Sequence, residues 1–352
     1  MKERQSNIEL LRLVSMYMIV IGHFVYHGIM TRSVVYPTQT GWDAFDSVLI
    51  HALCLCAVNT FVLISGYFSI RPKAKSFFNI YFIVAFYACI MYLVHLFVIG
   101  SHLNRWALYN TIMPFGLWHS STEWWFMPNY LLLFIVSPIL NKAIDAMTKR
   151  EMQVSLLLLG IVIFYFGWYR NMEWSQGGFN FVQFVFMYFI GRYLSLHTMV
   201  PQHGWRWGIG WLIGSIIIAT INFYKPMDSP FVWYINAHNS PLTVLAAVCL
   251  FNTFRSMPIK NNRVINWFAA SALAIYLLHD CAYFRDFLYG AIADIYDTHT
   301  LFVTYAMLFG LGLCIMICAP CVDKIRILIT NPLVKYSTIL YEKISGKILC
   351  QH

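Results

Sequence analysis

Ten long apolar runs constrain the fold of this chain more than any other feature of its sequence. A helix needs about 20 apolar residues to cross the hydrocarbon core of a bilayer, and most of the runs approach that length. Because segments inside lipid must satisfy their own backbone hydrogen bonds, such runs predict helices. We therefore predict an all-α, polytopic membrane helical bundle of about ten transmembrane helices. The predicted spans are residues 8–29, 45–69, 77–99, 124–141, 152–169, 178–196, 206–224, 240–255, 264–288 and 299–320.

The composition excludes the main alternatives to a membrane protein. Charged residues make up 11% of the 352 residues, whereas soluble domains average about 25%. The net charge of +9 does not indicate nucleic-acid binding, because the basic residues fall in short clusters between the apolar runs. The first run lacks a clear small-x-small cleavage site, so we interpret it as an uncleaved span.

The basic residues alternate between connections as the positive-inside tendency predicts. With a cytoplasmic N-terminus, 19 of the 24 Lys and Arg residues fall on the cytoplasmic side. We therefore expect both termini to be cytoplasmic, a single integral-membrane domain over residues 1–352, and a cytoplasmic tail over residues 321–352. The five outer basic residues are Arg32, Arg105, Arg170, Lys225 and Arg285.

Histidines dominate the ionisable residues within the spans. Such a residue costs roughly 2.5–3.5 kcal/mol on insertion scales, so each one is a candidate for function. The set is His23, His27, His51, His95 and His279, with Asp280 as the one acidic residue deep in a span. His23 and His27 have the i, i+4 spacing of helical zinc sites, but no Glu accompanies them in the segment. We predict no metal.

Arg12 and His23 lie on one face of the first span. Eleven residues correspond to three helical turns plus about 20°, and to a rise of about 16 Å. This pattern favours a cation at the cytoplasmic edge that binds an anionic donor, with a general base deeper in the membrane. The alternative is an interfacial arginine and a hydrogen-bonded core histidine.

Four motifs carry a resemblance to a known family. They are the stretch from Arg4 to Arg12 followed after ten residues by His23, the segment Phe61–Phe68 containing Ser65-Gly66-Tyr67, the segment Ser271–His279 containing Tyr276, and Trp124-Trp125-Phe126 with Tyr130, Pro138 and Asn141 downstream. In their order and spacing they resemble the membrane-bound acyltransferase-3 family, whose members are integral-membrane O-acyltransferases. The resemblance covers most of the chain.

The resemblance implies an activity and a location. We expect transfer of an acetyl group from cytoplasmic acetyl-CoA, a co-substrate rather than a bound cofactor, to a hydroxyl of a cell-surface polysaccharide or lipid-linked glycan. The expected location is the bacterial cytoplasmic membrane, with the lipid bilayer and the glycan as partners. The chain departs from the family in its thin basic loop after Ser65-Gly66, which holds Arg71, Lys73 and Lys75.

The expected site residues fall into three groups. His23 and His279 are the catalytic candidates, with His23 either a general base or a transient acyl carrier. The donor-binding candidates are Arg12, Arg71, Lys73, Lys75, Asn59 and Ser65, and the acceptor-side candidates are Glu123, Trp124, Trp125 and Tyr276.

Other interpretations of these residues stay open. The two tryptophans also fit an interfacial aromatic belt, and Ser65-Gly66 also fits close helix packing. His51 and His95 are interpreted as structural. A transporter or flippase of a glycan or other substrate, without acyl transfer, is the alternative function. The sequence leaves open the acceptor glycan, the acyl group and the oligomeric state.

Overall fold

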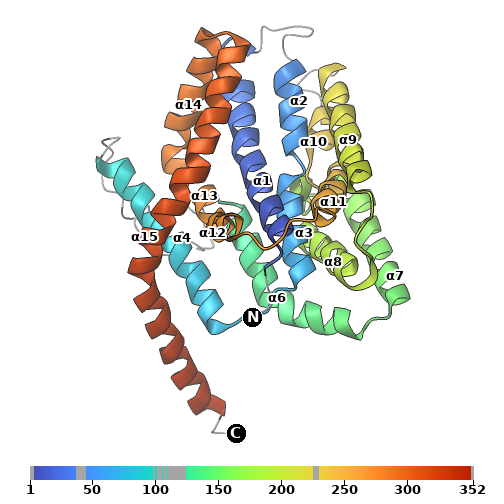
Figure 1. Cartoon of the computed structure of the whole chain (residues 1–352), viewed down its shortest axis with the longest axis vertical. Helices are drawn as coiled ribbons and strands as arrows, with labels where there is room; N and C mark the ends of the chain where they lie inside the picture. The colour runs from blue at the N-terminus through green and yellow to red at the C-terminus, as the bar shows by residue number, and fades with distance from the viewer. Residues whose placement is uncertain are drawn as a thin grey trace.

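The structure, a computed structural model, describes residues 4–36, 45–97, 100, 105, 109, 124–224 and 230–349. All regular secondary structure in this part of the chain is helical, as predicted (Figure 1). The helices are α1 (Ser6–His23), η1 (Phe24–Met30), α2 (Phe45–Cys54), α3 (Ala57–Phe68), α4 (Ala74–Phe97), α6 (Phe126–Ala146), α7 (Lys149–Gly160), η4 (Ile161–Tyr169), η5 (Gln176–Gly178), α8 (Phe181–His197), α9 (Gly204–Tyr224), α10 (Pro230–Asn236), α11 (Pro241–Arg255), α12 (Arg263–Ala269), α13 (Ala272–His279), α14 (Ala282–Thr298) and α15 (Leu301–Leu349).

Seven helical stretches of the described chain are long and apolar enough to cross a membrane. They are Ser6–Met30, Phe45–Phe68, Ala74–Phe97, Phe126–Ala146, Lys149–Tyr169, Gly204–Tyr224 and Leu301–Ser345. They coincide with seven of the ten predicted spans. Two others, 178–196 and 240–255, correspond to α8 and α11, which have 17 and 15 residues.

The predicted span over residues 264–288, which His279 and Asp280 interrupt, is not a single helix. The chain there forms α12, α13 and the first turns of α14, with interruptions after Ala269 and after His279. Asp280 ends α13 outside helical geometry, at φ −111° and ψ 30°, and Cys281 is extended at φ −81° and ψ 131°. Both residues are buried in protein. Non-helical backbone at membrane depth is tolerated in such a setting, because neighbouring helices can satisfy its polar groups.

Helix α1 is the spine of the bundle. It packs against α2, α3, α11, α12, α13 and α15 (Figure 1). At its end the chain passes without a break into the π-helix η1, which packs against α14. These contacts bring segments more than 250 residues apart in the sequence beside His23.

Glycines allow α3 and α8 to approach at backbone distance. A Cβ added at Gly66 would overlap the backbone of Tyr188, and one added at Gly191 would overlap the backbone of Leu63 and Tyr67. The alternative that Ser65-Gly66 serves close helix packing therefore holds for the glycine.

Helix α15 continues without a break through residues 301–349, past Pro320 and Pro332. The predicted tail thus begins as part of the last helix. Buried Asp323 accepts hydrogen bonds from Arg326 of the same helix (2.9 Å) and from the Tyr87 hydroxyl of α4 (3.3 Å). This network fixes the middle of α15 on the bundle.

Several of the connections predicted to be cytoplasmic lie toward one end of the molecule. Figure 1 shows the start of α1, the α3–α4 connection, the α6–α7 turn and the C-terminus toward its lower end. The ends of η1 and α9 lie toward the upper end. These connections thus share one end, and the cytoplasmic location of that end stays a prediction from the basic residues.

We expect Gly66→Ala to destabilise the protein by about 1–3 kcal/mol, because the added methyl group meets fixed backbone rather than a movable side chain. Thermal unfolding in detergent, followed by size-exclusion chromatography, measures the effect. Gly310→Ala is the matched control, since an added Cβ there has nothing within 4 Å. Equal melting temperatures for the two variants would contradict the close approach of α3 and α8.

Candidate functional site

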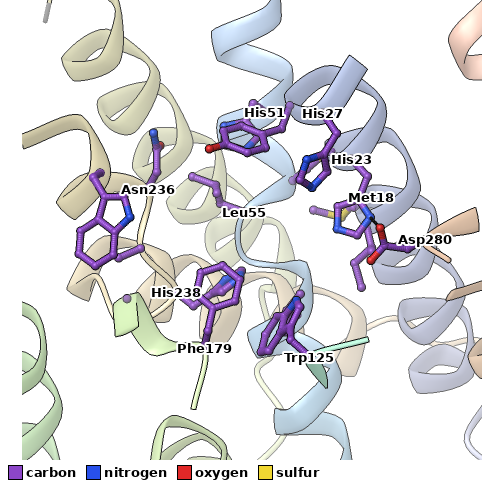
Figure 2. Close-up of a pocket in the computed structure, with 18 of the residues that line it drawn as sticks. Met18, His23, His27, His51, Leu55, Trp125, Phe179, Asn236, His238 and Asp280 are labelled. Atoms are coloured by element: carbon purple, nitrogen blue, oxygen red, sulfur yellow. Dashed lines mark ion pairs between the residues drawn. The ribbon is translucent and has the colours of Figure 1, made fainter. Parts of the chain in front are cut away.

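A cavity of about 390 Å³ lies at the junction of α1 and η1 with α2 and α3. Segments 177–179 and 233–238 close its opposite side, and Asp280 and Arg285 reach it from the break between α13 and α14. Figure 2 shows His23 and Asp280 on one side, and Phe179 and His238 across the cavity from them. Its lining holds four histidines, which are His23, His27, His51 and His238.

The two predicted catalytic histidines are in direct contact. His23 Nδ1 lies 3.1 Å from His279 Nε2, although 256 residues separate them in the sequence. The Oδ1 atom of Asp280 lies 3.6 Å from the same His23 nitrogen. The break between α13 and α14 therefore delivers a second histidine and a carboxylate to the end of α1.

Hydrogen bonding assigns the tautomer of each ring. His279 Nδ1 lies 2.7 Å from the carbonyl oxygen of Ile275, which only accepts, so this nitrogen carries a proton. In neutral His279 the Nε2 atom then accepts, and His23 Nδ1 must donate to it. The lone pair of His23 is left on Nε2. A ring held in this way is oriented to take up a proton.

Asp280 is fixed by further partners that the sequence analysis did not identify. Its Oδ1 atom accepts hydrogen bonds from Arg285 and from the Tyr289 hydroxyl, both at 3.1 Å. Arg285 was interpreted only as an outer basic residue, and Tyr289 was not singled out. Arg285 and Tyr289 lie in α14, after the helix break. Because the break was not predicted, the sequence did not indicate that their side chains reach Asp280.

A second group of rings extends the histidine cluster. The His51 ring stacks on Tyr26, with centroids 5.2 Å apart, and His27 stacks on Tyr289 at the same distance. His51 Nδ1 is buried without a hydrogen-bond partner. His51, which was interpreted as structural, therefore lines the cavity with an unused polar atom. Among the described residues, no group of three or more His, Cys, Asp or Glu side chains is arranged so that it could bind a metal ion.

The wall opposite His23 is aromatic. Trp125 stacks on His238 with centroids 5.6 Å apart, and Phe179 packs edge-on against both rings. His238 was not identified from the sequence, because it lies between two apolar helices without a recognisable pattern. Among the acceptor-side candidates that the structure describes, Trp125 alone lines this cavity.

The other candidates within the bundle lie outside the cavity lining. Asn59 is buried, donates to the carbonyl oxygen of His238 (2.7 Å) and accepts from Gln183 (3.1 Å). Ser65 donates to the carbonyl oxygen of Phe61 on its own helix. Trp124 is 2% exposed, and Tyr276 packs edge-on against Phe126 behind His279. Glu123 lies outside the described residues.

The predicted donor-binding cations lie toward the opposite end of α1 from the cavity. Arg12 forms an ion pair with Glu9 (3.2 Å), and its side chain is 26% exposed. Arg71, Lys73 and Lys75 are exposed at the connection into α4. None of the four contacts the histidine cluster among the described interactions.

The family model described as an acyltransferase domain, Acyl_transf_3, matches residues 5–322. The chain belongs to the acyltransferase-3 family. No match was found among the curated proteins or among the solved structures. The matched region includes every residue of the histidine cavity, so this acyltransferase carries the cavity within its family domain.

We expect Asp280→Asn to lower the rate of acyl transfer by at least about tenfold, a loss that corresponds to about 1.4 kcal/mol of transition-state stabilisation. The substitution keeps the shape of the side chain but removes the charge beside His23. Rates are measured on purified protein of confirmed folding. Asp286→Asn, at an exposed position on the neighbouring helix α14, is the control. Equal rates for both variants would exclude an electrostatic role of Asp280.

Proposed function

We propose that this acyltransferase moves an acetyl group from cytoplasmic acetyl-CoA to a hydroxyl of a cell-surface polysaccharide or lipid-linked glycan. The contact between His23 and His279 beside Asp280, at the wall of a cavity within the membrane domain, carries this proposal. The family supplies the reaction class, and this cluster supplies a base for it.

His23 acts as the general base. Its Nε2 atom removes the proton from the acceptor hydroxyl, and the oxygen attacks the thioester carbonyl carbon. The carbon–sulfur bond then breaks, and the proton passes from His23 to the leaving thiolate. The products are an acetyl ester and free CoA, and His23 returns to its neutral form. General-base assistance of this kind is typically worth about 10²–10⁴ in rate.

His279 and Asp280 prepare His23 for this step. The hydrogen bond to His279 holds the His23 ring with Nδ1 protonated, which directs the basic lone pair to Nε2. Asp280 lies close enough to stabilise the positive charge that His23 gains when it accepts a proton. Tyr289 and Arg285 keep the carboxylate in place.

The two substrates reach the cavity from opposite sides of the membrane. Acetyl-CoA approaches from the cytoplasm, where Arg12 with Arg71, Lys73 and Lys75 attracts its phosphates. The acceptor sugar enters from the outer side and packs against the ring of Trp125, a large amphipathic surface suited to a sugar face. Trp124, Tyr276 and Asn59 then support the walls of the site.

Transport or flipping without acyl transfer is the weaker proposal. An ion-coupled transporter needs a carboxylate free to exchange its ion, and Asp280 is already bound to Arg285 and Tyr289.

We expect His23→Gln to abolish acetylation of envelope glycans while the protein accumulates normally in the membrane. Glutamine keeps polarity but cannot accept and return a proton at neutral pH. The acetyl-ester content of glycans is compared among cells with the wild-type protein, a deletion and the variant. His197→Gln, at the end of α8 and outside the cavity, is the control.

Retained acetylation in His23→Gln would overturn the catalytic assignment. Unchanged acetylation on deletion, in cells that make the acceptor glycan, would overturn acetyl transfer itself. An acetyl adduct on His23 after rapid acid quenching would replace the general base by an acyl carrier.

We expect Arg12→Ala to raise the KM for acetyl-CoA and to leave kcat nearly unchanged, because binding to the phosphates persists through the reaction. Initial rates at varied acetyl-CoA measure the split. Glu9→Gln is the matched variant, since it removes the ion-pair partner of Arg12 but keeps the guanidinium. A KM for Arg12→Ala equal to that of the wild type would refute its donor role.

A further inference from the structure

A second cavity, of about 350 Å³, lies at the beginning of α1. It is formed by the start of α1, the end of α3 and the connections after α8 and α11, and it shares no lining residue with the histidine cavity. Its lining residues are Arg4, Gln5, Asn7, Tyr67, Val200, Arg255, Ile259 and Asn261. Two arginines, three carboxamides and an aromatic ring thus face one space.

Arg255 is held rigidly in this cavity. The residue is only 6% exposed, and its two terminal nitrogens donate to the hydroxyl and the carbonyl oxygen of Thr198, both at 2.7 Å. Its guanidinium carbon lies 5.3 Å from the centre of the Tyr67 ring. Its Nε atom is buried without a hydrogen-bond partner. The cation is therefore fixed in position with a donor still unused.

The described structure pairs neither arginine of this cavity with a carboxylate. Arg4 donates to the carbonyl oxygen of Asn266 (3.0 Å), and the partners of Arg255 are neutral. The carbonyl groups at the end of α8 offset part of the charge of Arg255, since a helix C-terminus carries about half a negative charge. Because no lining residue is acidic, the cavity keeps a net positive charge, and burial of a charge without compensation is costly.

The chemistry of the lining selects a phosphate ester as the compensating group. Guanidinium groups bind phosphate oxygens through paired hydrogen bonds, and carboxamides add neutral donors. The N-terminus of α1 begins at Ser6, beside Gln5 and Asn7 of the lining, and its dipole also favours an anion. Tyr67 lies four residues before Arg71, so the exposed basic residues of the α3–α4 connection follow directly.

We propose that this cavity binds the phosphate esters of the nucleotide-linked acyl donor, with Arg4 and Arg255 as binding cations in addition to Arg12 and the basic residues of the α3–α4 connection. This inference rests on the proposed function, because that function supplies a donor of the acyl-CoA type. Gln5 and His23 are separated by about 27 Å along α1, at 1.5 Å per residue. The nucleotide end is then held at one end of α1 while the long flexible arm extends toward the histidine cavity.

Binding of adenosine 3′,5′-bisphosphate to the purified full-length protein tests this inference. The probe lacks both the thiol arm and the acyl group, so its binding is independent of catalysis. We expect saturable binding by calorimetry that weakens as salt rises. Arg4→Gln, an exposed position that folding tolerates, is expected to weaken the affinity about tenfold or more. Arg263→Gln, an exposed arginine outside the lining, is expected to leave it unchanged.

Arg255→Lys tests the buried cation. Lysine keeps the charge but loses the guanidinium fork that bonds Thr198, so we expect the variant to bind the probe more weakly and to melt below the wild-type temperature. Arg4→Gln, at an exposed position, is therefore the variant that tests binding by itself. Failure of the wild-type protein to bind the probe, or equal affinity in Arg4→Gln, would overturn the inference. If His23→Gln binds the probe like the wild type but transfers no acetyl group, the cavity and the catalytic proposal are both supported.

An anionic lipid headgroup offers the same phosphate chemistry. The binding experiment is therefore repeated in nanodiscs of phosphatidylcholine alone and with phosphatidylglycerol. Equal affinity for the probe in both kinds of nanodisc would support the acyl donor as the ligand of this cavity. Weaker binding with phosphatidylglycerol, with the difference abolished by Arg4→Gln, would identify the lipid as the occupant and overturn the assignment to the donor.

Discussion

The break between α13 and α14 is the feature on which the site depends. If residues 272–298 formed one continuous helix, the backbone groups of Asp280 would be hydrogen-bonded within that helix. The direction of its side chain would then be fixed by the helix geometry. The break instead leaves Asp280 free to meet His23, Arg285 and Tyr289 together. Such a break is stable in a membrane domain only when protein surrounds it, and the burial of Asp280 and Cys281 meets this condition.

Helix α1 connects the two ends of the proposed reaction. Its beginning, with Gln5 and Asn7, lines the second cavity, and His23 at its other end lines the histidine cavity. Its contacts with α3, α11 and α13 hold both cavities in one frame, so the separation between them is set by helix rise. This fixed separation suits a long donor molecule, because its nucleotide phosphates and its acyl group can then bind at the two cavities at the same time.

The sequence predicted an all-helical membrane fold, and among its candidates His23 and Trp125 line the histidine cavity while His279 contacts His23. The lengths of apolar runs and the positions of basic clusters are set by the bilayer itself, so they can be read without tertiary contacts. They predicted the helical bundle and seven of its spans. Arg12 and His23 were related through helix periodicity alone. His23 and His279 were both named as catalytic candidates, but their contact was not predicted, because periodicity within one helix does not show which helix faces meet. His238, Tyr289 and the role of Arg285 were missed, since each depends on tertiary contacts. Arg285 and Tyr289 bond Asp280 at the helix break, and His238 stacks on Trp125 across the cavity from His23.

The charges of the histidine cluster balance before the reaction and tolerate one additional proton during it. Asp280 and Arg285 form an ion pair at 3.1 Å, and the two histidines beside them are neutral in the assigned tautomers. In the proposed reaction His23 takes up a proton, and its charge then develops 3.6 Å from a carboxylate that is already oriented by Arg285 and Tyr289. The dipoles around His23 are thus already oriented in the folded protein, so the free energy of reorienting them does not add to the activation barrier. A lone histidine in lipid has no such compensation, whereas in this chain the break between α13 and α14 brings a second histidine and an aspartate from a distant part of the sequence to the end of α1.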